Sequence, residues 1–103
     1  MAYRIVWSPK AIDDADSIAL YISRDSTSYA AAVVRKILDT ARSLKAFPFA
    51  GRVVPELDDP NIRERFVYSY RVIYRIEENK VTIAAVIHGK RLLDSEQLDR
   101  GIK

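Results

Sequence analysis

The chain has 103 residues, no Cys and one His, with 49% hydrophobic and 30% charged residues and a formal net charge of +3. This length supports one hydrophobic core, which predicts a single domain over residues 1–103 and excludes a separate cofactor-binding domain. The lack of Cys excludes disulfides, zinc-thiolate sites and thiol nucleophiles, and we expect a cytoplasmic protein because neither a signal peptide nor a membrane span can be recognised.

The first predicted elements are a short strand and a helix. Aromatic and β-branched residues alternate over residues 3–7, which is the pattern of a strand. Ser8 and Pro9 then predict a helix start, because serine is a favoured N-cap and proline suits the first helical position. Asp13 and Asp14 lie in the early turns, where the helix dipole favours negative charge. The helix should end near Arg24, and its buried stripe holds Ala11, Ala15, Ile18 and Ile22.

A second helix is predicted after the polar residues 25–28, any of which is a suitable N-cap. Its apolar residues have the cleanest helical spacing in the chain, namely Ala30, Val33, Val34, Ile37, Leu38, Ala41 and Leu44. The prediction is an antiparallel helical hairpin whose second helix is terminated by Pro48. Residues 47–52 read Phe-Pro-Phe-Ala-Gly-Arg, and we expect a loop held by aromatic residues.

Three strands are predicted in the second half of the chain, at residues 62–67, 70–77 and 81–88. Residues 81–87 are almost continuously apolar, which is typical of a central strand covered on both faces. The element order is therefore β-α-α-β-β-β, followed by a short tail over residues 91–103 that has room for a last helical turn. This order predicts an α+β fold in which the helical hairpin packs on an antiparallel sheet.

Four arginines alternate along the first two of these strands: Arg63, Arg65, Arg71 and Arg75. Opposed residues of a hairpin lie on the same side of a sheet, so the loop between the strands decides which face each arginine takes. A three-residue loop at 68–70 would gather the arginines with Val67 and Ile73, a surface suited to an acidic amphipathic peptide or a phosphate backbone. A two-residue loop would instead place Arg63 and Arg65 opposite Arg71 and Arg75. Alternatively, the arginines are solvated or paired with Glu64, Glu77 and Glu78.

The net charge is distributed unevenly along the chain. Residues 1–60 hold eight basic and eight acidic side chains, whereas residues 61–103 hold nine basic and six acidic ones. A basic excess confined to one segment indicates a patch for an anionic partner, either nucleic acid or an acidic polypeptide. The alternative is that this modest charge only keeps a small domain soluble.

The only histidine, His88, ends the predicted central strand and precedes Gly89, Lys90 and Arg91. A lone histidine in a chain without Cys builds no histidine or thiolate metal site, so we expect neither a metal nor another cofactor. His88 is suited in kind to general acid or base catalysis of RNA cleavage. Phosphate would then be held by Arg52, Arg63 or Arg91, and Glu64 could be a second proton-transfer group. The alternative is a structural or partner-binding histidine.

The order and spacing of several short motifs are similar to those of the RelE/ParE superfamily of type II toxin-antitoxin toxins, and the chain most resembles its ParE branch. The resemblance covers nearly the whole chain. It rests on Trp7-Ser8-Pro9 with Ala11, the helical hairpin, Phe47-Pro48-Phe49-Ala50-Gly51-Arg52, Ile62-Arg63-Glu64, Tyr70-Arg71-Val72-Ile73-Tyr74-Arg75-Ile76 and His88-Gly89-Lys90-Arg91.

The resemblance implies a small toxin that causes growth arrest, contributes to plasmid stabilisation and is neutralised by an antitoxin encoded beside it. In ParD antitoxins a C-terminal segment wraps around the toxin, and an N-terminal ribbon-helix-helix dimer binds the operator DNA. ParE toxins act on DNA gyrase, whereas RelE relatives cut messenger RNA in the ribosome.

Three functions follow from this resemblance. We favour a gyrase inhibitor, because the tail after His88 offers no tyrosine and the residues form no convincing acid-base pair. The first alternative is a ribosome-dependent endoribonuclease that uses His88, Arg63 and Arg91. The second is a non-toxic module that only binds an antitoxin. For antitoxin binding, we expect an acidic amphipathic segment to bind the exposed groove of the helical hairpin and a basic sheet face: Arg52, Arg63, Arg65, Arg71, Ile73, Arg75, His88 and Arg91.

Overall fold

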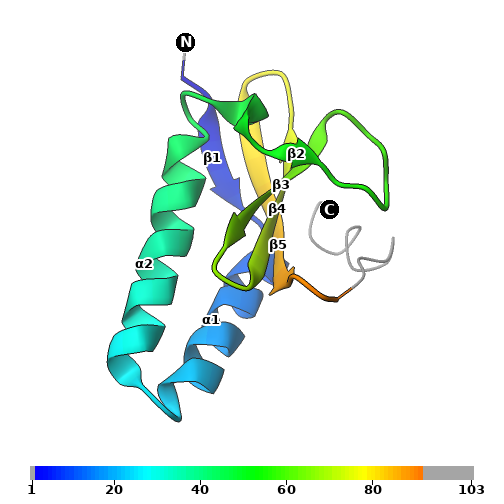
Figure 1. Cartoon of the computed structure of the whole chain (residues 1–103). Helices are drawn as coiled ribbons and strands as arrows, with labels where there is room; N and C mark the ends of the chain where they lie inside the picture. Colours follow the sequence, from blue (N-terminus) through cyan, green and yellow to red (C-terminus); the bar gives the residue numbers. More distant parts are fainter. Residues whose placement is uncertain (1, 92–103) are drawn as a thin grey trace.

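The computed structural model describes residues 2–91 and has two layers, a helical hairpin and a five-stranded sheet (Figure 1). The elements are β1 (Arg4–Trp7), α1 (Pro9–Ser23), α2 (Thr27–Ser43), the 3-10 helix η1 (Pro48–Ala50), β2 (Arg52–Val53), β3 (Ile62–Val67), β4 (Tyr70–Ile76) and β5 (Lys80–His88). The strand order is β1-β5-β4-β3-β2. The α+β prediction is confirmed, but the sheet is mixed because β1 runs parallel to β5. The unpredicted strand β2 has only two residues, too few to show an alternating pattern.

Both helices begin where the sequence predicts. The Ser8 hydroxyl accepts a hydrogen bond from the Ala11 N–H at the start of α1, and Ser26 caps α2 in the same way. The end of α2 differs from the prediction, because the helix stops at Ser43 and is not terminated by Pro48. Leu44, at the C-cap, is fully buried in the core.

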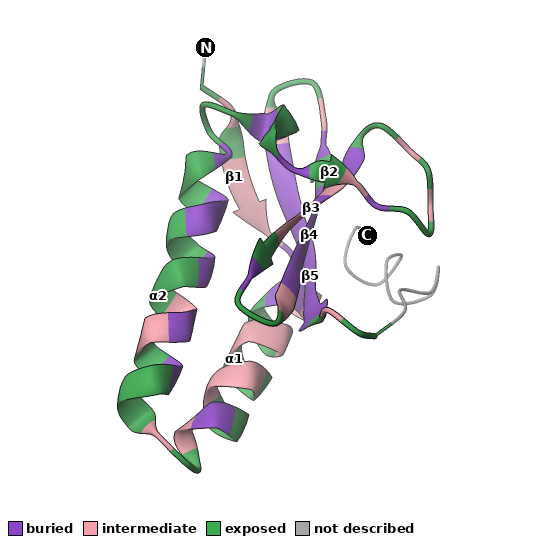
Figure 2. Ribbon diagram, viewed as in Figure 1, coloured by how far each residue is buried: buried purple, intermediate pink, exposed green. Residues whose placement is uncertain are grey.

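The core lies on both faces of the central strands, as predicted for β5 (Figure 2). On one face, residues of β4 and β5 pack against the inner sides of α1 and α2. On the other face a smaller cluster includes Ile73 and Ala85 and is completed by Val54 and Leu57 from the loop after β2. Every residue from Val81 to Ile87 is buried. Strand β5 is therefore an interior strand buried on both faces, next to β4 in the middle of the sheet.

Helix α1 also completes the hydrogen bonding of β5 beyond the end of β1. The pairing of β1 with β5 stops at Trp7 and Ile83. Past this point the Ser8 hydroxyl donates to the Ala84 carbonyl at 3.0 Å, and Asp14 Oδ2 accepts from the Val86 N–H at 3.0 Å. Asp14, which the sequence assigns only to the helix dipole, thus satisfies a strand edge where a neighbouring strand is missing.

Among residues 2–91, no helix is long and apolar enough to cross a membrane. The predicted tail lies outside the described residues except for its first residue, Arg91.

Candidate functional site

The connection between β3 and β4 divides the four arginines between two faces of the sheet. Val67 pairs with Tyr70, so the turn has only two residues, and the first of them, Tyr68, has a positive φ of 53°. Arg63 and Arg65 lie on the face that carries Val67 and packs against the helices. Arg71 and Arg75 lie on the opposite face. The expectation of one surface bearing all four arginines is therefore wrong, and the two-residue alternative is the one observed.

Arg71 is the centre of a buried ion network. Its Nε donates to Glu64 Oε1 at 2.6 Å, and its Nη1 and Nη2 donate to the two carboxylate oxygens of Glu56 at 2.8 Å. The other Glu64 oxygen accepts from Arg52 Nε. The pKa of Arg71 is raised by its hydrogen bonds to Glu56, although its burial opposes this shift. Arg71 therefore remains charged and holds β3, β4 and the loop between β2 and β3 together.

Burial removes two residues from the predicted antitoxin surface. The Arg71 side chain is only 4% exposed, and Ile73 is completely buried in the cluster behind the sheet. A partner could touch either residue only after the covering loop had moved. Both residues therefore act in the fold, and the structure corrects their assignment to a binding face.

Arg63 of β3 and Tyr74 of β4 hold the loop at residues 47–51 through hydrogen bonds to its backbone. The buried Tyr74 hydroxyl donates to the Pro48 carbonyl at 2.7 Å and accepts from the Gly51 N–H at 3.0 Å. Arg63 donates to the carbonyls of Gly51 and Pro60 at 3.0 and 2.9 Å. The aromatic residue that holds the loop is Tyr74 of β4, whereas Phe47 and Phe49, the aromatic residues within the loop, are exposed.

The remaining predicted arginines are accessible to different degrees. The Arg52 side chain is 59% exposed and its guanidinium lies 5.4 Å from the centre of the Phe66 ring. Arg65 is half-buried, and Arg75 and Arg91 are exposed. These four side chains keep the accessibility that the antitoxin prediction requires, but they do not share one face.

His88 lies at the end of β5 beside Tyr70, with the two ring centres 5.8 Å apart. Its Nδ1 accepts from the Lys90 N–H, and together with Arg91 it lines a hollow of about 490 Å³ beside α1. The other proposed nuclease residues lie elsewhere. Arg63 pairs with Tyr74, four positions along β4 from the Tyr70 that pairs with His88. Glu64 is buried between two arginines on the opposite face.

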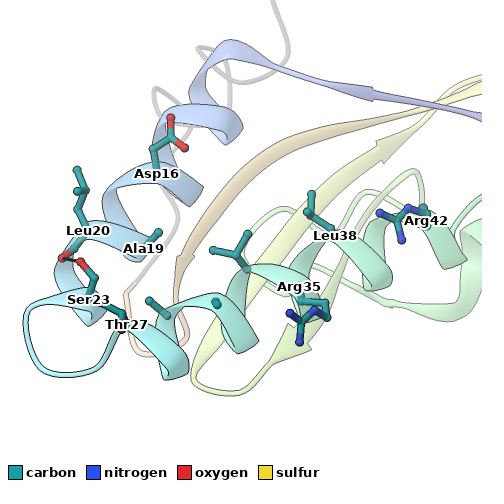
Figure 3. Close-up of a pocket in the computed structure, with 11 residues that line it drawn as sticks. Asp16, Ala19, Leu20, Ser23, Thr27, Arg35, Leu38 and Arg42 are labelled. Atoms are coloured by element: carbon teal, nitrogen blue, oxygen red, sulfur yellow. Dashed lines mark hydrogen bonds between the residues drawn. The ribbon is translucent and has the colours of Figure 1, made fainter.

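An apolar groove with a volume of about 850 Å³ lies between α1 and α2 (Figure 3). Leu20 and Leu38 are exposed there, on α1 and α2 respectively. A neighbouring hollow lined by Trp7 and Ile12 shares Asp16, Val34 and Leu38 with it, so the two form one apolar strip. We call this strip the interhelical groove. Such a groove was predicted from the sequence without its residues. Val34 and Leu38 belong to the predicted apolar set of the second helix, whereas Leu20 lies outside that of the first.

The two sides of the interhelical groove carry different charges. Arg35 and Arg42 line it from α2, and Asp16 lines it from α1. Arg42 forms an ion pair with Asp39, whereas no ion pair involving Arg35 is found within residues 2–91. The groove therefore combines an apolar floor with a cationic rim on one side, which fits an amphipathic segment with acidic side chains.

Comparison with known proteins gives one family match and several structural neighbours. The family model for the ParE toxin of the type II toxin-antitoxin system, parDE, matches residues 5–93. A structure of the chromosomal ParDE TA system from P. aeruginosa has a TM-score of 0.69 and 19% identity over 84% of this chain and 96% of that chain. The YoeB/ParE toxin from Agrobacterium tumefaciens has a TM-score of 0.61 and 23% identity over 82% and 96%.

A third structure, the YoeB dimer from Staphylococcus aureus, has a TM-score of 0.59 and 17% identity over 85% of this chain and 98% of that chain. At these identities the structural neighbours show a shared fold. No curated protein matches the chain.

Proposed function

This chain belongs to the ParE toxin family of type II toxin-antitoxin systems, and we propose that it arrests growth by binding and inhibiting DNA gyrase in the cytoplasm. As a member of this family it is the toxin component and has an antitoxin partner. The observation that carries the choice of a binding toxin is the position of Arg63 and Glu64. Both were candidates to act with His88 in RNA cleavage, and both are instead bound into other parts of the fold.

The neutralising partner in this proposal is a ParD-like antitoxin whose acidic amphipathic segment occupies the interhelical groove. Such a segment would bury apolar side chains against Leu20 and Leu38 and direct carboxylates toward Arg35. The antitoxin's own DNA-binding part would then hold the complex on operator DNA. In this proposal the antitoxin binds the operator DNA and the toxin does not.

Two assays with purified toxin separate the candidate activities. Gyrase supercoiling is measured beside translation-coupled cleavage of a messenger RNA, each with and without antitoxin. We expect inhibition of supercoiling and intact message, with activity restored by antitoxin. Cleaved message with unimpaired gyrase would instead assign the RelE-like activity, for which the shared hollow of His88 and Arg91 is the structural basis.

The groove is tested by Leu20→Glu, which places a negative charge on an exposed apolar position where it does not disturb the core. We expect antitoxin affinity to fall about tenfold or more. The new carboxylate repels the acidic segment, and the apolar contact with Leu20 is lost. The matched control is Tyr21→Glu on the same helix, at a residue that does not line the groove. Equal affinities for the two variants would remove the groove from the antitoxin interface.

A further inference from the structure

The loop between α2 and β2 presents two phenylalanine rings to solvent. Phe47 is 68% exposed and Phe49 is 53% exposed, whereas Pro48 between them is buried. We call residues 46–50 the phenylalanine loop. Its Phe rings contribute nothing to the two hydrophobic clusters of the core. Exposed aromatic rings that the fold does not use are typical of a protein interface.

The backbone of this loop is fixed before any partner arrives. The Tyr74 hydroxyl forms hydrogen bonds with Pro48 and Gly51 at the two ends of η1. Arg63 of β3 donates a hydrogen bond to the Gly51 carbonyl. A methyl group on Gly51 would collide with the Tyr74 hydroxyl and the Glu64 backbone, so the chain is packed closely at this point. The two rings are therefore held on a rigid base, which reduces the entropy lost on binding.

The surroundings of the phenylalanine loop are cationic. Arg42 and Arg52 are paired with Asp39 and Glu64, but Lys45 and Arg63 beside the loop form no ion pair among the described residues. The Arg63 guanidinium lies 4.9 Å from the centre of the Phe49 ring, so positive charge directly contacts the apolar surface. A complementary partner would offer an apolar pocket bordered by carboxylates.

The phenylalanine loop is separate from the interhelical groove and differs from it in shape. The two surfaces share no lining residue. The loop lies at the end of the molecule opposite the connection between α1 and α2 (Figure 1). A groove can receive a segment that folds on binding, whereas exposed rings on a rigid base suit insertion into a preformed pocket of a folded protein.

We infer that the phenylalanine loop is the element by which this toxin contacts its target protein, inserting Phe47 and Phe49 into an apolar pocket with an acidic border. The inference rests on the proposed function, in which the target is gyrase. It assigns target binding and antitoxin binding to different surfaces of one small domain.

The test compares wild type with a Phe47→Ala/Phe49→Ala variant in three measurements: gyrase supercoiling, affinity for the antitoxin, and growth arrest on induction. The matched control is Tyr21→Ala, which removes an aromatic ring of nearly equal exposure, 67%, from α1. We expect the loop variant to need about tenfold or more toxin for the same inhibition, with antitoxin affinity unchanged. Unchanged antitoxin affinity also demonstrates that the variant is folded.

A second variant tests the positive charge beside the phenylalanine loop and leaves both rings in place. Lys45 is exposed, and Lys45→Glu should weaken gyrase inhibition and reduce its dependence on salt concentration. Equal inhibition by wild type and the loop variant would overturn the inference and leave the proposed function intact. A wild-type toxin that arrests growth without inhibiting gyrase would instead overturn the proposed function. Loss of antitoxin affinity in the loop variant, with gyrase inhibition retained, would reassign the loop to the antitoxin interface.

Discussion

Arg71 and Glu64 form a buried ion pair on the sheet face away from the helices, with Nε and Oε1 2.6 Å apart. The Glu64 side chain is fully buried and contacts a second arginine, Arg52, while Arg71 also binds Glu56. Charged groups are this deeply buried only when they are paired and hydrogen-bonded. The network therefore fixes the loop after β2 against the sheet, and this loop covers the smaller hydrophobic cluster.

Removal of Arg71 should cost far more stability than removal of a neighbouring arginine. Arg71→Ala leaves Glu64 and Glu56 without their shared partner, and we expect the free energy of unfolding to fall by about 3–5 kcal/mol. Arg75→Ala on the same strand is the matched control, because Arg75 is exposed. Urea unfolding of both variants provides the comparison. Equal losses would show that the network does not stabilise the fold.

The Tyr74 hydroxyl should matter more than its small size suggests. Tyr74→Phe removes the hydrogen-bond partner of both the Pro48 carbonyl and the Gly51 N–H. We expect a loss of about 1–3 kcal/mol in urea unfolding, since a buried polar group without a partner keeps its full desolvation penalty. Hydrogen exchange at Gly51 should accelerate in the same variant. Wild-type exchange at this amide would contradict the role of Tyr74 in holding the loop.

Stability should decline in alkaline solution. Burial raises the pKa of Tyr74, and burial together with the charges of Tyr29 and Tyr21 raises the pKa of Tyr70. Both residues thus bind their protons more tightly in the folded chain than in the unfolded chain. The stability they contribute is complete below about pH 10 and is lost as the pH rises through the folded pKa.

Urea unfolding from about pH 8 to about pH 11 measures this decline. Tyr74→Phe should reduce its slope because one of the two raised pKa values is removed. A slope identical to wild type would mean that Tyr74 ionises equally in both states.

His88 should be dispensable for the toxin's effect on gyrase. Its ring is exposed, and its Nδ1 accepts a hydrogen bond only from the backbone of Lys90 among the described residues. We therefore expect His88→Ala to inhibit supercoiling and arrest growth as wild type does. A variant that loses growth arrest, while the wild type cleaves messenger RNA, would establish His88 as part of a nuclease site.

Local patterns predicted the elements well because their causes are local. The helix start at Ser8-Pro9 and the continuous apolar run of β5 can both be recognised from residues that are adjacent in the sequence. The register of β3 and β4 was not predictable in this way. Its two-residue turn places Tyr68 at positive φ, a conformation usually signalled by Gly or Asn, and neither is present. A register with a three-residue turn would instead place Arg63 and Arg65 on the same face as Arg71 and Arg75.

The candidate site was predicted less completely because its residues meet across long separations. Arg71 is buried by Glu56 and Glu64, and no local pattern distinguishes it from the exposed Arg75. The sequence predicted a loop at residues 47–52, but it did not show that Phe47 and Phe49 are exposed. The hydrogen bonds of Tyr74 and Arg63 to the backbone hold the loop in place while the rings remain exposed.

The central claim is tested most directly by titrating purified, antitoxin-free toxin into a gyrase supercoiling reaction. We expect supercoiling to fall as toxin is added and to return when the antitoxin is supplied in equal amount. Full supercoiling in the presence of a large excess of folded toxin would contradict it.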